Sequence, residues 1–233
     1  MPNERWTIKT ADGAFSAYVA KPSGPGPWPG LVVIQEIFGV NAVMRDTCDR
    51  FAAQGYLAVC PDLFWRIQPG IDITDHSEAE WKQAFGYYNA FDVDKGIEDI
   101  AATLAQTRAG ADCGGRAGAV GYCLGGLLAY LTACRTDSDA TAAYYGVGIE
   151  NHLGEAEKLA NPLLLQIAEE DGFVPKEAQA RIKAALQNHP CVTLYSYPGR
   201  DHAFCRPGGQ NFDQADADLA NQRALAFFKR NLG

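Results

Sequence analysis

A cysteine in a glycine-rich turn is the first residue of this sequence that could do chemistry. Cys123 lies in the run GYCLGG (121–126), between a predicted strand at 116–120 and a predicted helix at 127–131. The run has the form of the G-x-S-x-G nucleophile elbow with Cys in place of Ser, where the glycines permit a strained turn. The helix dipole there favours a thiolate, and the N–H of Leu124 points at the group under attack. The alternative is a tight turn around a buried structural cysteine.

A nucleophilic thiol is helped by a base and by an acid that orients the base. In one common chain order, the acid and then the base follow the nucleophile. Two predicted strands in the second half of the chain end shortly before Asp171 and His202. Because parallel strands end at one edge of a sheet, we expect both residues to lie near Cys123. Glu169 and Glu170 are alternatives for the acid, although Asp171 precedes a glycine and fits a tight turn best.

The choice of His202 as the base depends on its position, since the sequence has four histidines. His76 stands at a predicted helix start, His152 lies in a loop, and His189 lies at the opposite end of the predicted sheet. Among the four, His202 is the one that follows a strand of the second half at the edge of Cys123. The alternative for His202 is a surface histidine beside a glycine turn.

A carboxylate follows the first predicted central strand, at 31–35. Glu36 stands there among apolar neighbours, and a buried carboxylate needs a partner. This loop is where a second backbone donor for an oxyanion is expected, and the N–H of Ile37 is the candidate. Glu36 could tune the thiol or accept its proton. The alternatives are a solvated loop residue or an ion pair with Arg45.

The elements that must position these residues alternate between strands and helices along the whole chain. Strands are predicted at 7–20 (a hairpin around 12–13), 31–35, 57–60, 116–120, 141–145, 163–168 and 192–197, and helices at 45–54, 78–90, 93–108, 127–131, 175–187 and 212–229. This order predicts one α/β domain spanning residues 1–233, with a mostly parallel sheet and helices on both faces. Ligands of such sheets bind beyond the carboxyl ends of the strands.

Composition excludes several classes of function. The 233 residues carry a net charge of −8 and the pI is about 5.0, which argues against nucleic-acid binding. No run is long enough to span a bilayer, and residues 1–6 have no signal-peptide pattern, so we expect a cytoplasmic protein without a membrane partner. Seven irregularly spaced cysteines suggest neither a disulfide framework nor a zinc site. We expect a monomer that needs no cofactor or metal and acts on a small molecule.

Taken together, these motifs resemble the dienelactone hydrolase (carboxymethylenebutenolidase) family of the α/β-hydrolase superfamily. The similarity covers nearly the whole chain and is most specific in the runs QEIFGVN (35–41), CPDL (60–63), GYCLGG (121–126), YYG (144–146), DGFVP (171–175) and GRDH (199–202). The resemblance implies a Cys123–His202–Asp171 triad. It also implies that Glu36 holds the resting thiol and takes its proton when substrate binds. Attack on a lactone would then give an acyl-enzyme through an enolate that helps to expel the product.

The resemblance also implies a substrate class, with one departure from the family. The family substrate is a small carboxylate-bearing lactone, 4-carboxymethylenebut-2-en-4-olide, which is opened to maleylacetate in the degradation of aromatic compounds. Two arginines grip it in the family, and one of them matches Arg206. The second position holds Trp81 here, and a tyrosine of the same helix is replaced by Phe85. With these residues, Phe38 and Tyr145 are expected to contact the substrate.

The departure at position 81 leaves the substrate open. Arg66 or Lys82 could supply the charge instead of an arginine at position 81. If Trp81 lines the pocket, a bulkier or less acidic substrate becomes plausible. A general carboxylesterase or thioesterase with the same triad is therefore the alternative function. A non-catalytic binding module is disfavoured because no triad position is missing.

Overall fold

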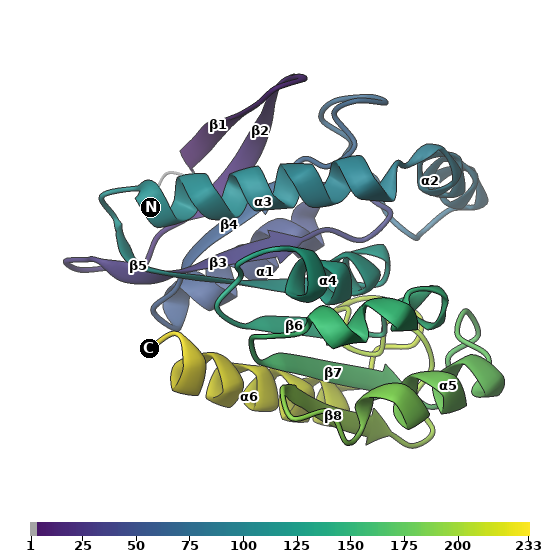
Figure 1. Ribbon diagram of the computed structural model, residues 1–233. Coiled ribbons are helices and arrows are strands. Elements are labelled where there is room, and N and C mark those ends of the chain that lie inside the picture. The colour runs from purple at the N-terminus through teal and green to yellow at the C-terminus, as the bar shows by residue number, and fades with distance from the viewer. Residues whose placement is uncertain (1–3) are drawn as a thin grey trace. The chain divides into compact units, whose positions relative to one another are not determined.

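The computed structural model describes residues 4–233 (Figure 1), so the first three residues of the N-terminal segment lie outside it. The chain forms two compact units, the first ending at Ala119 and the second beginning at Val120. Strand β5 (Cys113–Tyr122) leads the chain from one to the other. The single-domain organisation expected for residues 1–233 stays a prediction.

Strands of the first unit combine a hairpin with a parallel pair. Its strands β1 (Glu4–Thr10), β2 (Gly13–Ala20), β4 (Leu57–Pro61) and β3 (Trp28–Ile34) are neighbours in that order. β1 and β2 pair antiparallel with Thr10 opposite Gly13, as the hairpin prediction requires. β3 and β4 pair parallel, with Val32 opposite Val59. The buried run of β3 therefore ends at the loop that carries Glu36.

The helices of the first unit begin at side-chain caps. They are α1 (Ala42–Ala53), α2 (Glu78–Ala90) and α3 (Val93–Ala109), capped by Asn41, Ser77 and Asp92, whose side chains each accept a backbone N–H three residues on. Helix α1 begins three residues before the predicted start at residue 45, because the side chain of Asn41 caps its first turn.

Two of these helices cover opposite faces of the strands (Figure 1), as the alternation along β4 shows. Leu57 and Val59 belong to a core cluster that also packs against Ala102 of α3. Cys60 instead lies within hydrogen-bond reach of Cys48 on α1. Successive side chains of a strand point to opposite faces, so α3 covers one face and α1 the other.

The second unit continues with parallel strands. β6 (Thr141–Tyr144), β7 (Leu163–Ala168) and β8 (Val192–Tyr197) follow β5 in order, and the pairs β6–β7 and β7–β8 are parallel. The predicted bounds of β7 and β8 match the structure. Two short 3-10 helices, η1 (Ile149–Asn151) and η2 (Leu153–Lys158), were not predicted.

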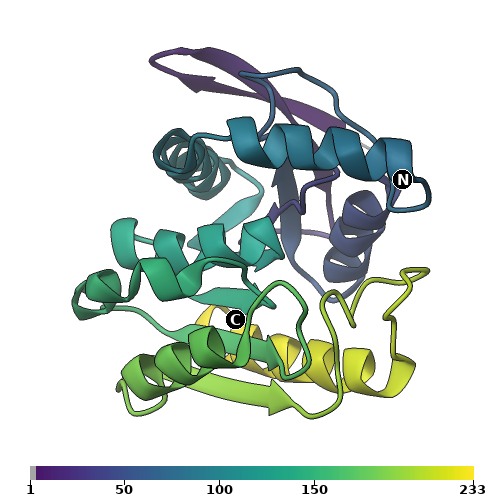
Figure 2. The same cartoon turned by 90° about the vertical axis from the view of Figure 1, so that its right-hand side faces the viewer.

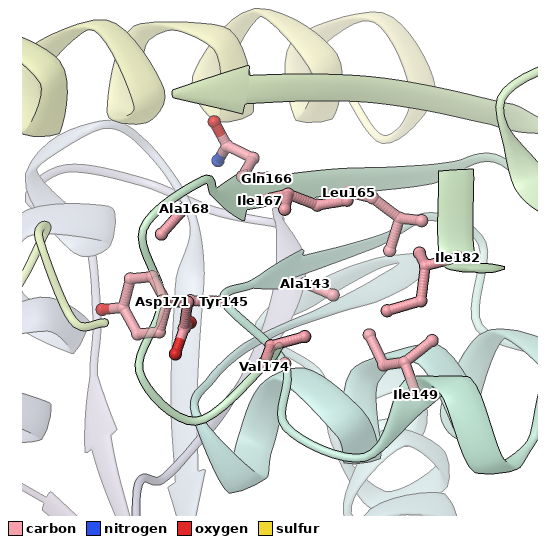
Figure 3. Close-up of a pocket in the computed structure, with 11 residues that line it drawn as sticks. Ala143, Tyr145, Ile149, Leu165, Gln166, Ile167, Ala168, Asp171, Val174 and Ile182 are labelled. Atoms are coloured by element: carbon pink, nitrogen blue, oxygen red, sulfur yellow. The ribbon is translucent and has the colours of Figure 1, made fainter. Parts of the chain in front are cut away.

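Helices α4 (Leu124–Arg135), α5 (Lys176–Leu186) and α6 (Gln214–Asn231) complete the second unit. α6, yellow in Figures 1 and 2, runs beside β8, where Arg223 lies over the ring of Tyr195 at 3.9 Å. Figure 3 shows Leu165 of β7 facing Ile182 of α5, while Gln166 points to the other side. Helices therefore cover both faces of these strands, which confirms the predicted α/β class.

No helix of residues 4–233 combines the length and apolarity that are needed to cross a bilayer.

Candidate active site

The structure places Cys123 in a strained turn between β5 and α4. Its φ is 59° and ψ −117°, a conformation that is rare for a residue with a side chain. The N–H of Cys123 donates to the carbonyl of Tyr144 (3.2 Å), and its carbonyl accepts from Gly126 (2.9 Å). A Cβ at Gly121 would lie 1.8 Å from the carbonyl oxygen of Gly125, so this turn requires glycine there. The predicted elbow geometry is present.

The turn also prepares a backbone donor. The amide of Leu124 is the first of α4, and the first four N–H groups of a helix have no acceptor within it. The side chain of Cys123 precedes this helix start, where the dipole stabilises negative charge. The sulfur of Cys123 and the backbone N–H of Leu124 therefore lie next to each other in one turn. A nucleophilic sulfur and a hydrogen-bond donor for an oxyanion require this arrangement.

Asp171 and His202 meet in the second unit, at the carboxyl ends of β7 and β8. Oδ2 of Asp171 lies 2.9 Å from Nδ1 of His202, and Oδ1 lies 3.1 Å from it. The residues are 6% and 4% exposed. The imidazole is also within hydrogen-bond reach of Cys123, which is 9% exposed. All three residues predicted for the triad are therefore brought together.

The charge of the imidazole follows from these neighbours. Burial by itself lowers the pKa of His202, but the charge of the Cys123 thiolate and the hydrogen bonds to Asp171 and Cys123 raise it more, to about 10. The site therefore favours the positively charged form of the His202 imidazole.

The alternative acids both form ion pairs with lysines. Glu170 pairs with Lys176 at 2.8 Å, and Glu169 pairs with Lys183 at 3.2 Å. The side chain of Glu170 is more than half exposed. These contacts give both glutamates a role outside the site and favour Asp171 as the acid.

Aromatic rings and strained residues surround the imidazole. The rings of Tyr145 and Phe173 approach His202 edge-on, with centroids 5.2 and 4.8 Å away. Tyr145 has φ 36° and Ala203, directly after His202, has φ 61°. With Cys123, these are the three non-glycine residues of the described chain with positive φ. Strained backbone conformations persist only where the surrounding structure holds them, and they occur most often at functional sites.

Arg206 is the predicted anion reader, and it is buried. Arg206 is 8% exposed. Its backbone N–H donates to the carbonyl of Ala203 (2.9 Å), in the turn that follows His202. Burying a guanidinium is costly unless it meets a negative or polar group. Its role toward a substrate carboxylate stays a prediction.

In the first unit, the loop after β3 is buried and tied at both ends. Glu36, Ile37 and Phe38 are all buried. Oε1 of Gln35 accepts the N–H of Leu63 at 3.0 Å. The loop ends at Asn41, the N-cap of α1. The side-chain amide of Asn41 also donates to the carbonyl of Ile73, in the segment before α2, at 2.9 Å. The roles of Glu36 and Ile37 stay predictions.

The predicted substrate-contact residues of the first unit form an aromatic row. The ring of Phe38 meets Trp81 at 5.1 Å, and Trp81 stacks on Phe85 at 5.6 Å. Phe38 is buried and Phe85 is 39% exposed, so the row leads from the loop after β3 to the surface. The indole N–H of Trp81 donates to the carbonyl of Asp75 at 3.0 Å. Trp81 therefore presents an apolar ring where the family resemblance expects a charge.

The structure weighs against Arg66 as a replacement for that charge. Arg66 forms ion pairs with Asp99, which is fully buried, and with Asp12 at 2.9 Å. It also lies over the ring of Trp65 at 4.3 Å. Two carboxylates already compensate this guanidinium. For Lys82, the other alternative, the substrate role stays a prediction.

Sequence reasoning missed residues that hold the site in place. Phe173 lies two residues after Asp171 and Ala203 directly after His202, and neither residue is predicted from the sequence. Asp201 was also passed over, yet its carboxylate bonds to two loops of the site. A signal was present, because an Asp directly before a proposed base can cap its own loop.

Comparisons with known proteins place the chain among relatives of one family. The family model described as "Dienelactone hydrolase family" matches residues 15–232. A protein of Azospirillum brasilense named "Putative carboxymethylenebutenolidase" is 54% identical over 230 residues, covering 95% of this chain and 96% of that protein. The carboxymethylenebutenolidase of Pseudomonas putida is 37% identical over 228 residues, covering 97% and 96%.

A solved structure extends the similarity to the fold. A Klebsiella pneumoniae protein described as "Putative Dienelactone Hydrolase" shares 25% identity with a TM-score of 0.85, and 98% of each chain is covered. This likeness confirms the predicted α/β-hydrolase fold.

Proposed function

The chain belongs to the dienelactone hydrolase family and is a hydrolase of lactone or ester bonds, and we propose that it opens a small carboxylate-bearing lactone through Cys123 as nucleophile. The observation that carries this proposal is the contact of Cys123, His202 and Asp171 inside one compact unit. The name of the Pseudomonas putida relative, carboxymethylenebutenolidase, supports a carboxymethylenebutenolide as substrate. The family resemblance implies 4-carboxymethylenebut-2-en-4-olide in particular, with maleylacetate as product. The degradation of aromatic compounds is the proposed context.

The first half of the reaction makes a thioester. The thiolate of Cys123 adds to the lactone carbonyl. The carbonyl oxygen becomes negative and accepts a hydrogen bond from the backbone N–H of Leu124. The second donor is proposed from the sequence to be Ile37. When the carbonyl re-forms, the ring C–O bond breaks, and the ring oxygen leaves as an enolate that takes the proton of the His202 imidazolium, which leaves His202 neutral.

The second half returns the free enzyme. His202, now neutral, accepts a proton from water as the oxygen of that water attacks the thioester carbon. The C–S bond then breaks and the thiolate of Cys123 leaves, restoring the ion pair with the imidazolium. Asp171 stays ionised throughout and keeps Nδ1 protonated, so that Nε2 is the nitrogen that exchanges protons.

Glu36 is proposed to take the proton of the resting thiol when substrate binds, which forms the attacking thiolate beside the imidazolium, and to return the proton to the sulfur after the product leaves. Its support is a buried carboxylate directly before the proposed donor Ile37, together with the family resemblance. Because the loop is held at both ends, the Glu36 carboxylate can keep this proton inside the protein rather than release it to water.

The alternative function is a general esterase or thioesterase, and the aromatic row favours it. Phe38, Trp81 and Phe85 offer apolar faces rather than a second positive charge. Such a surface favours flat or uncharged groups over a second carboxylate contact.

A substrate panel distinguishes the two functions. kcat/KM is measured for the cis and trans dienelactones and for uncharged activated esters and thioesters of similar size. The proposed function predicts a clear preference for the dienelactones, lost on removal of Arg206. A preference for uncharged aryl esters that is insensitive to Arg206 would contradict it and establish the alternative.

A further inference from the structure

One carboxylate oxygen joins the two loops that carry the acid and the base. Oδ1 of Asp201 accepts the backbone N–H of Gly172 at 2.9 Å and the backbone N–H of His202 at 2.6 Å. Gly172 directly follows Asp171, the proposed acid. The peptide groups beside both members of the pair therefore share a single acceptor.

The shared acceptor acts across two strands. Asp171 lies on the loop after β7, and His202 lies on the loop after β8. A second link between these loops runs from the N–H of Glu170 to the carbonyl of Arg200 at 2.8 Å. The acid is also held within its own loop, because Oδ1 of Asp171 accepts the N–H of Phe173 at 2.9 Å. Hydrogen bonds tolerate only a few tenths of an ångström, so these contacts restrict the relative movement of the two loops.

We propose that Asp201 is a positioning residue that sets the separation between the Asp171 carboxylate and the His202 imidazole. This inference rests on the proposed function, since it concerns the same pair. A bond to an ionised carboxylate is stronger than one between neutral groups, which suits an acceptor that must hold two donors. Misplacement of a catalytic group by about 1 Å can cost on the order of a hundredfold in rate.

Several charged and aromatic groups face the imidazole of His202, and each of them can influence its protonation. In the second unit they are the Asp171 carboxylate, the Cys123 thiol and the rings of Tyr145 and Phe173, with the Asp201 carboxylate at the backbone of His202. Loss of the bridge should loosen Asp171 from Nδ1. The thiolate–imidazolium pair would then be less stable, and the thiol would ionise at a higher pH.

A matched control lies on the same loop. Asn211 donates through Nδ2 to the carbonyl of His202 at 3.0 Å, so it holds the loop of the base without touching the loop of the acid. Asn211→Ala reports on general loosening of that loop. Asp201→Asn keeps an oxygen acceptor and removes the charge, whereas Asp201→Ala removes both.

The test measures kcat and KM for an activated ester, and the pH dependence of iodoacetamide alkylation of Cys123. We expect Asp201→Ala to lower kcat by about ten- to a hundredfold, with KM changed less than about threefold, and to move the alkylation midpoint to higher pH. Asp201→Asn should recover most of kcat and of the midpoint. Asn211→Ala should leave the midpoint unchanged. If Asp201→Ala does not fold, Asp201→Ser, whose hydroxyl is too short to serve both loops, takes its place.

Three results would overturn the inference. A wild-type midpoint and kcat in Asp201→Ala would show that the bridge does not position the pair. Equal effects of Asp201→Asn and Asp201→Ala would assign the effect to charge alone. An equal midpoint shift in Asn211→Ala would assign it to general loosening. Failure of the proposed function is distinguishable, because the wild-type enzyme would then retain activity after complete alkylation of Cys123.

Discussion

Replacement of Asp171 by Asn has an effect that can be worked out from the geometry. Oδ1 of Asp171 accepts the N–H of Phe173 at 2.9 Å, and Oδ2 faces Nδ1 of His202, also at 2.9 Å. In the variant, the amide oxygen stays on Phe173, because its N–H requires an acceptor. The amide nitrogen then takes the place of Oδ2. A donor therefore faces Nδ1, which must become an acceptor, and the proton moves to Nε2.

Two losses follow from that change. The imidazolium loses a buried hydrogen bond to a charged partner, which is worth about 1.5–3 kcal/mol. Since about 1.4 kcal/mol is tenfold, this loss alone lowers kcat/KM by about ten- to a hundredfold. The wrong tautomer adds to it, because a protonated Nε2 on a neutral ring cannot accept the proton of water. We therefore expect Asp171→Asn to lower kcat/KM by on the order of a hundredfold or more.

The assay is hydrolysis of an activated ester and of a dienelactone, with folding checked by circular dichroism. Glu170→Gln is the matched control, because Glu170 is exposed and pairs with Lys176. It should keep kcat/KM within about twofold, as expected for a surface pair worth less than about 1 kcal/mol. If Asp171→Asn were active while Glu170→Gln was crippled, the acid would be wrongly assigned.

Four further substitutions test separate parts of the account. Arg206→Ala should lower kcat/KM for carboxylate-bearing lactones by about ten- to a hundredfold and leave uncharged esters nearly unchanged, whereas Trp81→Arg should improve the acidic lactone; equal losses on both substrates would give Arg206 a structural role. Glu36→Gln should slow turnover and alter the pH dependence of thiol alkylation; identical profiles would return Glu36 to a structural role. Cys123→Ser removes a charge that raises the pKa of His202 to about 10, so NMR titration should show the imidazole losing its proton at lower pH than in the wild type, and an unchanged value would argue against the ion pair.

Much of the site could be predicted because its residues stand at the ends of strands. The bounds of β7 and β8 follow from continuous apolar runs, and Asp171 and His202 come soon after them. Parallel pairing then brings these ends together whatever the loops do. The turn at Cys123 was predictable for a different reason, because its glycines are a steric requirement that is visible in the sequence.

The features that could not be predicted depend on contacts between loops. The acceptor role of Asp201 needs the loop after β7 to lie against the loop after β8 in one register. The indole N–H of Trp81 donates to the carbonyl of Asp75. Because this bond satisfies the polar group of the indole, the rest of the ring is an apolar surface. Hydrophobic periodicity carries no information on either arrangement, since both are set by side-chain hydrogen bonds across irregular segments.

The central claim is that the sulfur of Cys123 forms the bond to the substrate, and the kinetics of Cys123→Ser test it most directly. A serine hydroxyl is far less acidic than a thiol, so a site arranged for a thiolate will not ionise it. We predict that kcat/KM for the lactone falls by on the order of a thousandfold or more in a folded variant, while Cys205→Ser, at another buried cysteine of the same unit, stays within a few fold of the wild type. Near wild-type turnover by Cys123→Ser would contradict the account.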